Sequence, residues 1–263
     1  MTAAAERAGF RLPVSGHSVG FHEPTGDDEM LLADARAHDL GLAIDVARRL
    51  ISRADGAELD WNALTMTDLD AALLGLRQQV VGDRISTDTS CRRCHTRIDI
   101  DFRVSDFLAH HAPRRPRNVA AASEDGWFRL AGAEVTFRLP NCGDQRVLGT
   151  ATSAEAELVR RCVDPPAIPG RVLQRIGRAV EMMAPMLFGV VHGRCPACDA
   201  ETPLRFDPQR FVLVELSDDA VLVYDDVHVI ASYYHWPESD ILALPASRRR
   251  RYADMVRQAT GNP

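Results

Sequence analysis

Two cysteine pairs constrain the fold of this sequence more than any other feature. The first pair is Cys91 and Cys94 in the stretch "CRRCH", the second is Cys195 and Cys198 in "CPAC", and 100 residues separate the two pairs. Two cysteines at this spacing form half of a four-cysteine zinc site, in which four thiolates close a tetrahedral shell. A chain that uses both pairs must bring two distant segments to one point.

The residues around each pair predict a turn between two strands. After the first pair, every second residue is apolar over a stretch typical of a half-buried strand: Ile98, Ile100, Phe102 and Val104. A short polar turn and an extended segment, "DAETPLRFD", follow the second pair, and "DRISTDTS" and "LFGVVHGR" precede the pairs as candidate strands. We therefore expect two zinc-ribbon knuckles, with a folded insertion between them, that share one structural zinc ion through Cys91, Cys94, Cys195 and Cys198.

The cysteine pairs also match other kinds of site. "CRRCH" matches the attachment pattern of a c-type haem, but haem attachment normally follows export and leaves the second pair unused. A redox role for "CPAC" requires that the motif open a helix, whereas Pro203 and an extended segment follow it. Knuckles that bind no metal, iron in place of zinc, and a histidine ligand in place of a cysteine stay open; the candidate histidines are His95, His192 and His228.

Composition indicates a soluble globular protein, with 46% hydrophobic and 26% charged residues. A net charge of −6 gives no global attraction to nucleic acid or to an anionic membrane. The N-terminal stretch lacks an apolar run of signal-peptide length, and no run of about 18 apolar residues predicts a membrane span. We expect a cytoplasmic protein, whose thiols stay reduced and available for metal. Cys142 and Cys162 have no partner at metal spacing, and Cys162 falls in a helical pattern as a core residue.

The pattern along the chain predicts an α+β fold that is predominantly helical. One helix is well marked: Thr65 and Asp68 form a capping-box pattern before an apolar stripe, and Gly82 suits its C-terminal cap. Gly41 is expected to split or kink the helical pattern before it. We divide the chain into an N-terminal loop or arm (1–26), N-terminal helices with the first knuckle (27–111), an inserted hairpin with two helices (112–186), the second knuckle (187–206) and C-terminal helices (207–263).

No catalytic site is recognisable in the sequence. It has no glycine-rich phosphate loop, no GxSxG, no HExxH and no three-ligand metal site with an open position. Four cysteine ligands would saturate a zinc ion and leave no place for water or substrate. We therefore expect a protein that is not an enzyme and has no small-molecule substrate.

The sequence resembles the T-even-type phage baseplate hub assembly family, which also occurs in phage-like contractile injection systems. The resemblance covers most of residues 28–258. It rests on Gly82–Asp83–Arg84 before the first pair, on "CPAC" ahead of Asp207–Pro208, and on a C-terminal block containing Tyr234, Trp236, Glu238, Ile241, Leu242, Arg250, Arg251 and Tyr252. The sequence departs from the family at "CRRCH", which stands where Cys-Pro-x-Cys is usual.

The resemblance implies a non-enzymatic role in assembling the baseplate or hub of a contractile tail, with other baseplate or hub proteins as partners. Aromatic and arginine side chains are the types that most often anchor protein interfaces. The candidate partner-binding residues are therefore Tyr234, Trp236, Arg248, Arg249, Arg250 and Arg251. The alternative is a zinc-ribbon nucleic-acid-binding protein that uses the same arginine run and Arg114, Arg115 and Arg117. The acidic net charge argues against it, because non-specific affinity depends on neutralising phosphates.

Overall fold

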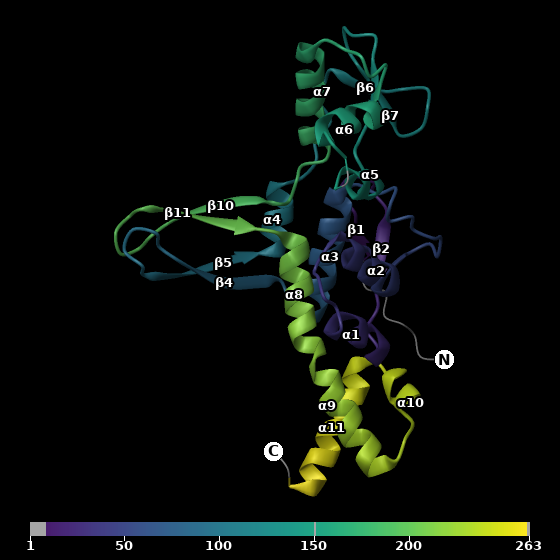
Figure 1. The fold of residues 1–263 in the computed structure, drawn as a ribbon, viewed down its shortest axis with the longest axis vertical. Coiled ribbons are helices and arrows are strands. Elements are labelled where there is room, and N and C mark those ends of the chain that lie inside the picture. Colours follow the sequence, from purple (N-terminus) through teal and green to yellow (C-terminus); the bar gives the residue numbers. More distant parts are fainter. Residues whose placement is uncertain (1–8, 150, 262–263) are drawn as a thin grey trace.

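A computed structural model describes residues 9–149 and 151–261 and combines helices with short antiparallel sheets, which confirms the α+β class. The molecule is elongated (Figure 1). A central body carries a two-hairpin arm on one side, the inserted segment at one end and the last three helices at the other. Three separate clusters of buried apolar residues lie in the body, the insertion and the C-terminal helices. The five-part division of the chain stays a prediction.

The body contains a small sheet that the sequence did not reveal. Strand β2 (Ser18–Phe21) pairs with β1 (Phe10–Arg11) on one side and with β3 (Ile51–Arg53) on the other. The prediction of a loop over residues 1–26 is therefore wrong for these strands, which are too short to show an alternating pattern. Phe10 and Phe21 pack closely against the helix that contains Gly75. A Cβ atom at position 75 would lie only 2.7 Å from the Phe21 ring, so the close approach requires glycine there.

Two helices follow where a split was predicted. They are α1 (Gly26–Ala33) and α2 (Leu40–Leu50). The break covers residues 34–39 and lies before Gly41, because the Asp39 side chain accepts a hydrogen bond from the Leu42 backbone N–H (3.1 Å) and caps α2. Gly41 lies within the first turn of that helix.

The long helix α3 (Met66–Val80) begins where the sequence places it. The Thr65 hydroxyl accepts a hydrogen bond from the Asp68 backbone N–H (3.2 Å). The Asp68 carboxylate accepts hydrogen bonds from the backbone N–H groups of Val14 (2.8 Å) and Ser15 (3.0 Å). This acidic side chain therefore fixes the N-terminal segment on α3. Gly82 follows the helix with φ +116°, a conformation that favours glycine.

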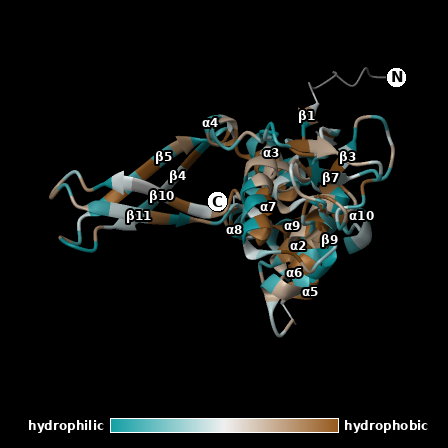
Figure 2. Cartoon of the chain, turned by 90° about the horizontal axis from the view of Figure 1, so that it is seen from above, coloured by the Kyte–Doolittle hydropathy of each residue, from teal (hydrophilic) through white to brown (hydrophobic). Residues whose placement is uncertain are grey.

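The arm consists of two antiparallel hairpins. The first is β4 (Arg84–Ser90) with β5 (Arg97–Arg103), the second is β10 (Gly189–Arg194) with β11 (Glu201–Phe206), and each is a separate two-stranded sheet. Figure 2 shows the hairpins side by side and pointing away from the body. Helix α4 (Val104–His110) follows β5 at the base. The predicted strand–turn–strand context of both cysteine pairs is thus correct.

The inserted segment is larger than the predicted hairpin and two helices. Its sheet has the order β6-β7-β8-β9, and three helices accompany it. The elements are β6 (Val119–Ala121), β7 (Trp127–Leu130), β8 (Thr136–Arg138), α5 (Cys142–Leu148), α6 (Ala154–Cys162), β9 (Val163–Asp164) and α7 (Gly170–Met183). The predicted hairpin turns at Gly132, whose φ is +72°. Helices α5 and α6 are separate because Asn141 and Ser153 each cap a new start.

The C-terminal third is helical, as predicted. Its helices are α8 (Pro208–Ala220), α9 (Leu222–Tyr234), α10 (Glu238–Leu242) and α11 (Ala246–Thr260). Asp207 caps α8 and Pro208 is its first residue. The break after α8 lies at Val221. Ser247 lies in the first turn of α11, where its backbone N–H donates to the Glu23 carboxylate (2.8 Å).

Candidate metal centre

The two cysteine pairs occupy the same turn at the ends of the two hairpins. In the first turn, the His95 backbone N–H donates to the Cys91 carbonyl (2.9 Å), and the Cys91 N–H donates to the Thr96 carbonyl (2.9 Å). The second turn repeats both bonds at 2.9 Å, from Asp199 to Cys195 and from Cys195 to Ala200. His95 (φ 58°) and Asp199 (φ 55°) adopt the same left-handed conformation after the second cysteine of each pair. "CRRCH" therefore forms the same turn as "CPAC" without its proline.

The four sulfur atoms converge across the gap between the hairpins. Cys91 Sγ lies 3.6 Å from Cys198 Sγ, and Cys94 Sγ lies 3.5 Å from Cys195 Sγ. All four sulfurs lie within 4.8 Å of one another. A tetrahedral shell with Zn–S bonds of about 2.3 Å has S–S edges of about 3.8 Å. The four cysteines therefore fit one metal ion, and they fill a tetrahedral shell completely.

Hydrogen bonds at the first pair favour the thiolate form that binds metal. The Thr96 hydroxyl, 3.3 Å from Cys94 Sγ, and the Thr96 backbone N–H lower the pKa of the Cys94 thiol to about 6. The backbone N–H groups of Cys94 and Arg93 lower the pKa of the Cys91 thiol. These donors are part of the turn, so the fold itself prepares the ligands.

The fourth sulfur, that of Cys198, is held in the protonated form by its three neighbours. The Ala200 backbone N–H lowers the pKa of the Cys198 thiol, but the adjacent Cys94 sulfur, burial and the other two cysteines outweigh it and raise that pKa to about 12. Four thiolates this close repel one another, because like charges disfavour ionisation of their neighbours. A divalent cation between the sulfurs would remove that repulsion, so the donor set matches a soft or borderline metal.

No histidine joins the cysteines in the described part of the chain. The four cysteines are the only group of three or more His, Cys, Asp or Glu residues there whose ligand atoms converge at metal-binding distance. His95 is exposed beside its turn and His228 is exposed on α9. The side chain of His192 lies outside the described residues. Cys142 and Cys162 are buried in the body and the insertion, away from the centre, as expected for Cys162.

The two hairpins of the arm contact each other at the tip and at the base. At its tip, Ile98, Ile100 and Ala200 pack beside the cysteines. At its base, the Phe206 ring of the second hairpin meets Phe102 at 5.1 Å and Phe107 at 5.2 Å between ring centroids, both edge to face. An isolated two-stranded hairpin is marginally stable in water. The cysteine centre therefore supplies the second point at which the two hairpins are joined.

The structure corrects the predicted partner surface in the C-terminal helices. Arg249 is fully buried, and its guanidinium donates to the carboxylates of Glu29 and Asp226 (3.3 Å to Asp226). Arg250 bridges Glu29 (2.9 Å) and Asp219 (2.6 Å). Arg249 therefore cannot face a partner, and Arg250 makes ion pairs within the chain. The buried carboxylates of Glu29 (α1) and Asp226 (α9) need a cation beside them, because a buried charge without a partner is strongly destabilising.

The remaining predicted residues lie around an aromatic cluster. Trp236 stacks on Tyr234 at 5.2 Å and meets Tyr252 edge to face at 5.3 Å, and all three rings are half-buried. Arg248 lies over the Tyr252 ring (5.8 Å), and Arg251 is exposed. Only the two outer arginines of the run are therefore free to face solvent.

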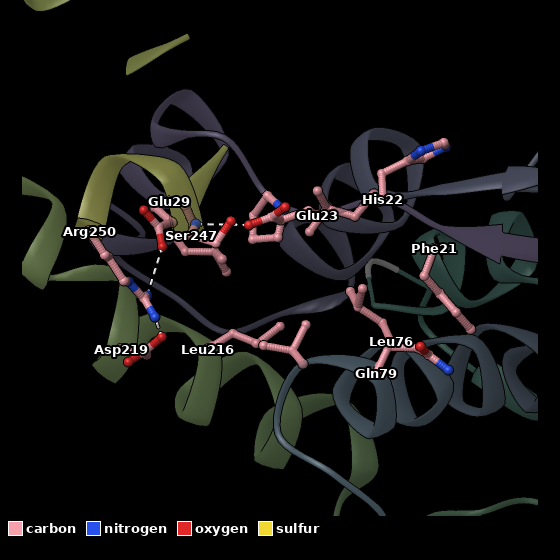
Figure 3. A pocket seen from close by; sticks show the side chains of 15 residues that line it. Phe21, His22, Glu23, Glu29, Leu76, Gln79, Leu216, Asp219, Ser247 and Arg250 are labelled. Carbon is pink, nitrogen blue, oxygen red and sulfur yellow. Dashed lines mark hydrogen bonds and ion pairs between the residues drawn. The ribbon is translucent and has the colours of Figure 1, made fainter. Parts of the chain in front are cut away.

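A cavity of 320 Å³ lies where these helices meet the body (Figure 3). Its apolar wall includes Leu76 and Leu216, and Figure 3 shows Arg250 at one end, between Glu29 and Asp219. At the same end, the Ser247 N–H meets Glu23. The polar groups at this end pair with one another across the contact between α11 and the body. The cavity therefore lies at the packing interface between α11 and the body.

Comparisons with known proteins give one family. The family model described as "T4 bacteriophage base plate protein" matches residues 7–174, more than half of the chain. The matched range contains the first cysteine pair and ends within α7, before the second pair. No curated protein and no solved structure matches the chain. In the described residues, no helix is long and apolar enough to cross a membrane.

Proposed function

The chain belongs to the T4 bacteriophage base plate protein family, and on that premise we propose that it is a non-enzymatic assembly protein for the baseplate or central hub of a contractile tail. The family match carries this proposal. It supports a structural role in a phage baseplate, and the proposal extends that role to hub assembly and to phage-like contractile injection systems. Assembly would take place in the cytoplasm.

We propose that the four cysteines hold one structural zinc ion. A saturated shell of four cysteine ligands leaves no position for water or substrate, which is the arrangement of a structural site. We propose zinc rather than iron because a closed shell of four cysteines, two from each of two hairpin turns, is typical of structural zinc sites. When bound, the ion would neutralise the thiolates and join the hairpins; Cys91 and Cys94 would hold it from one side, Cys195 and Cys198 from the other.

The exposed part of the C-terminal block is proposed as a partner-binding surface. Arg248 and Arg251 are exposed at the start of α11, and Arg248 lies over Tyr252, which shares a cluster with the half-buried Tyr234 and Trp236. Charged groups at an interface rim direct orientation and association rate more than affinity. The proposed partners are other baseplate or hub proteins. The nucleic-acid alternative is weakened because the inner arginines of the run pair with carboxylates of the chain itself.

A deletion and rescue experiment tests the proposed function. The gene is removed from a strain that makes contractile particles, and particles are counted by electron microscopy after rescue with the parent chain or with an empty vector. We expect loss of particles with complete baseplates, and recovery with the parent. Normal particles without the chain would contradict the assembly role, and a shift of nucleic acid by the chain at physiological salt would favour the alternative.

A further inference from the structure

The segment that leads into β10, at the base of the arm, exposes apolar side chains at alternate positions. Met186, Phe188 and Val190 are exposed by 74%, 42% and 47%, whereas Leu187 between them is 2% exposed. A strand that borders solvent on one face normally places polar residues on that face. Here each outward position from residue 186 to 190 is a large apolar side chain.

The segment is fixed in place, so this exposure does not arise from a loose loop. The Thr67 hydroxyl donates to the Pro185 carbonyl (3.0 Å), and Leu187 lies in the body core. Val190 belongs to β10, where it pairs with Arg205 of β11. The three apolar side chains are therefore held outward by a backbone that is anchored on both sides.

The first hairpin of the arm provides an internal comparison. Its outer face is charged and self-neutralised, with Arg84 paired to Asp101 (3.0 Å) and Arg97 paired to Asp88 (2.9 Å). Its apolar residues Ile85 and Ile98 point inward and are buried. The two hairpins have the same turn and contribute two cysteines each, yet only the second has an apolar outer face near its base. The architecture of the arm does not require that face.

The apolar segment continues into a cavity. A volume of 400 Å³ lies between the start of β10 and α4, lined by Phe102, Phe107, His110, Leu187, Val190 and Phe206 among others. Val190 belongs both to this lining and to the exposed row. The cavity has room for a bulky apolar side chain, the kind of group that anchors a protein interface in a pocket.

Arg205 places a positive charge beside the exposed apolar side chains. The Arg205 guanidinium lies over the Phe188 ring at 5.6 Å. In the described part of the chain, no ion pair joins Arg205 to a carboxylate, in contrast to the paired arginines of the first hairpin. An arginine stacked on an exposed aromatic ring presents its remaining N–H groups to an incoming acidic residue.

We propose that the arm patch, defined as Met186, Phe188, Val190 and Arg205, docks a baseplate protein that presents a bulky apolar side chain to the neighbouring cavity and a carboxylate to Arg205. This inference rests on the proposed function, since it assigns a surface to the assembly partner. The single cation and the net charge of −6 favour a protein over an anionic membrane. The metal centre at the tip would hold the hairpin that carries the patch in its orientation.

The test uses the intact chain co-expressed with each baseplate or hub protein from the same tail gene cluster, followed by titration of the one that co-purifies. The test variant is Met186→Ser/Phe188→Ser/Val190→Ser. The matched control is Val221→Ser/Leu222→Ser, which removes apolar side chains that are exposed by 54% and 49% at the α8–α9 junction. Metal content and melting temperature of each variant establish that it is folded.

We expect the triple variant to bind about 30-fold more weakly or worse, and the control to bind like the parent. Arg205→Glu should weaken binding, and Arg205→Lys should retain most of it. Equal binding by the folded triple variant overturns the arm patch and leaves the proposed function intact. Self-association of the parent that the triple variant abolishes, with the baseplate partner still bound, also overturns it in favour of a second copy. A parent that binds no baseplate protein, in a strain that assembles particles without it, removes both proposals.

Discussion

Cys94 and Cys195 are 101 positions apart in the chain, and their sulfur atoms lie 3.5 Å apart. Bringing them together closes a loop that contains the whole inserted segment. Loop closure of this length has an entropic cost that the contacts at the arm tip, Ile98, Ile100 and Ala200, must offset. A metal ion held by all four sulfurs would help to offset this entropic cost, because the free energy of metal binding contributes to the free energy of folding.

The first prediction concerns loss of a ligand. Cys91→Ser or Cys198→Ser should lower the free energy of unfolding by at least about 2 kcal/mol, a fraction of the ~10 kcal/mol that structural zinc contributes in small zinc-dependent domains. The effect is smaller here because the body has its own core. Urea unfolding measures it, with Arg93→Ser at the same turn as the control. A metal chelator should lower the melting temperature of the parent and leave that of Cys91→Ser unchanged; equal responses would contradict the account.

The second prediction concerns the buried charge network. Arg249→Ala should cost about 3–5 kcal/mol, because it leaves the buried carboxylates of Glu29 and Asp226 without their shared cation. Arg251→Ala, at an exposed position of the same helix, should change stability by less than about 0.5 kcal/mol. Chemical denaturation of both variants checks this. Similar stabilities for the two variants would show that the network contributes little.

The third prediction concerns pH. Burial raises the pKa of Asp70 to about 7, against a hydrogen bond from Gln209 (2.6 Å) that lowers it. Because the folded pKa lies above the unfolded value of about 3.9, the folded state binds the extra proton, and Asp70 destabilises the fold progressively as pH rises from 4 to 7.

Asp70→Asn removes that ionisation and keeps an oxygen for Gln209. At pH 8 the variant should be more stable than the parent, by up to about 4 kcal/mol for a difference of about three pKa units. Near pH 4 the two proteins should have the same stability. Urea unfolding of both proteins at pH 4, 6 and 8 measures the difference, and a constant difference across that range would show that Asp70 does not titrate with the fold.

The fourth prediction concerns the outer arginines of α11. Arg248→Glu/Arg251→Glu should fold normally, since both side chains are exposed, and should slow association with the baseplate partner, more so at low salt. Stopped-flow binding measures the rate, with Arg114→Glu/Arg117→Glu as a matched charge control on the insertion. An unchanged association rate would place the partner surface elsewhere and leave the arm patch as the remaining candidate.

Local patterns in the sequence predicted the convergence of the four cysteines, while the metal itself stays a prediction. Alternation of Ile98, Ile100 and Phe102 indicated β5, and the matching spacing of the cysteines indicated that both turns serve one centre. Helix α3 was also predictable, because Thr65 is a strong cap and Gly82 permits the left-handed turn. In each case neighbouring residues determine the structure.

Features that depend on distant contacts were not predictable. Arg249 lies in a run of four arginines, a pattern typical of a solvated face. Its ion pair with Glu29 depends on the position of α1, which the local sequence does not reveal. Strands β1 and β2 are short, and Gly75 on α3 permits the close approach that holds them. Residues 187–190 were predicted as the start of a candidate strand, and the outward apolar row was not foreseen, since a short sequence does not show which of its faces is buried.

The central claim is that one zinc ion, held by Cys91, Cys94, Cys195 and Cys198, joins the two hairpins of the arm. Elemental analysis of the purified chain by plasma mass spectrometry tests it most directly, with Arg93→Ser and Cys91→Ser/Cys198→Ser analysed in parallel. The account predicts one zinc per chain in the parent and in Arg93→Ser, and close to none in the double cysteine variant. A folded parent chain without stoichiometric zinc, or with iron in its place, would contradict it.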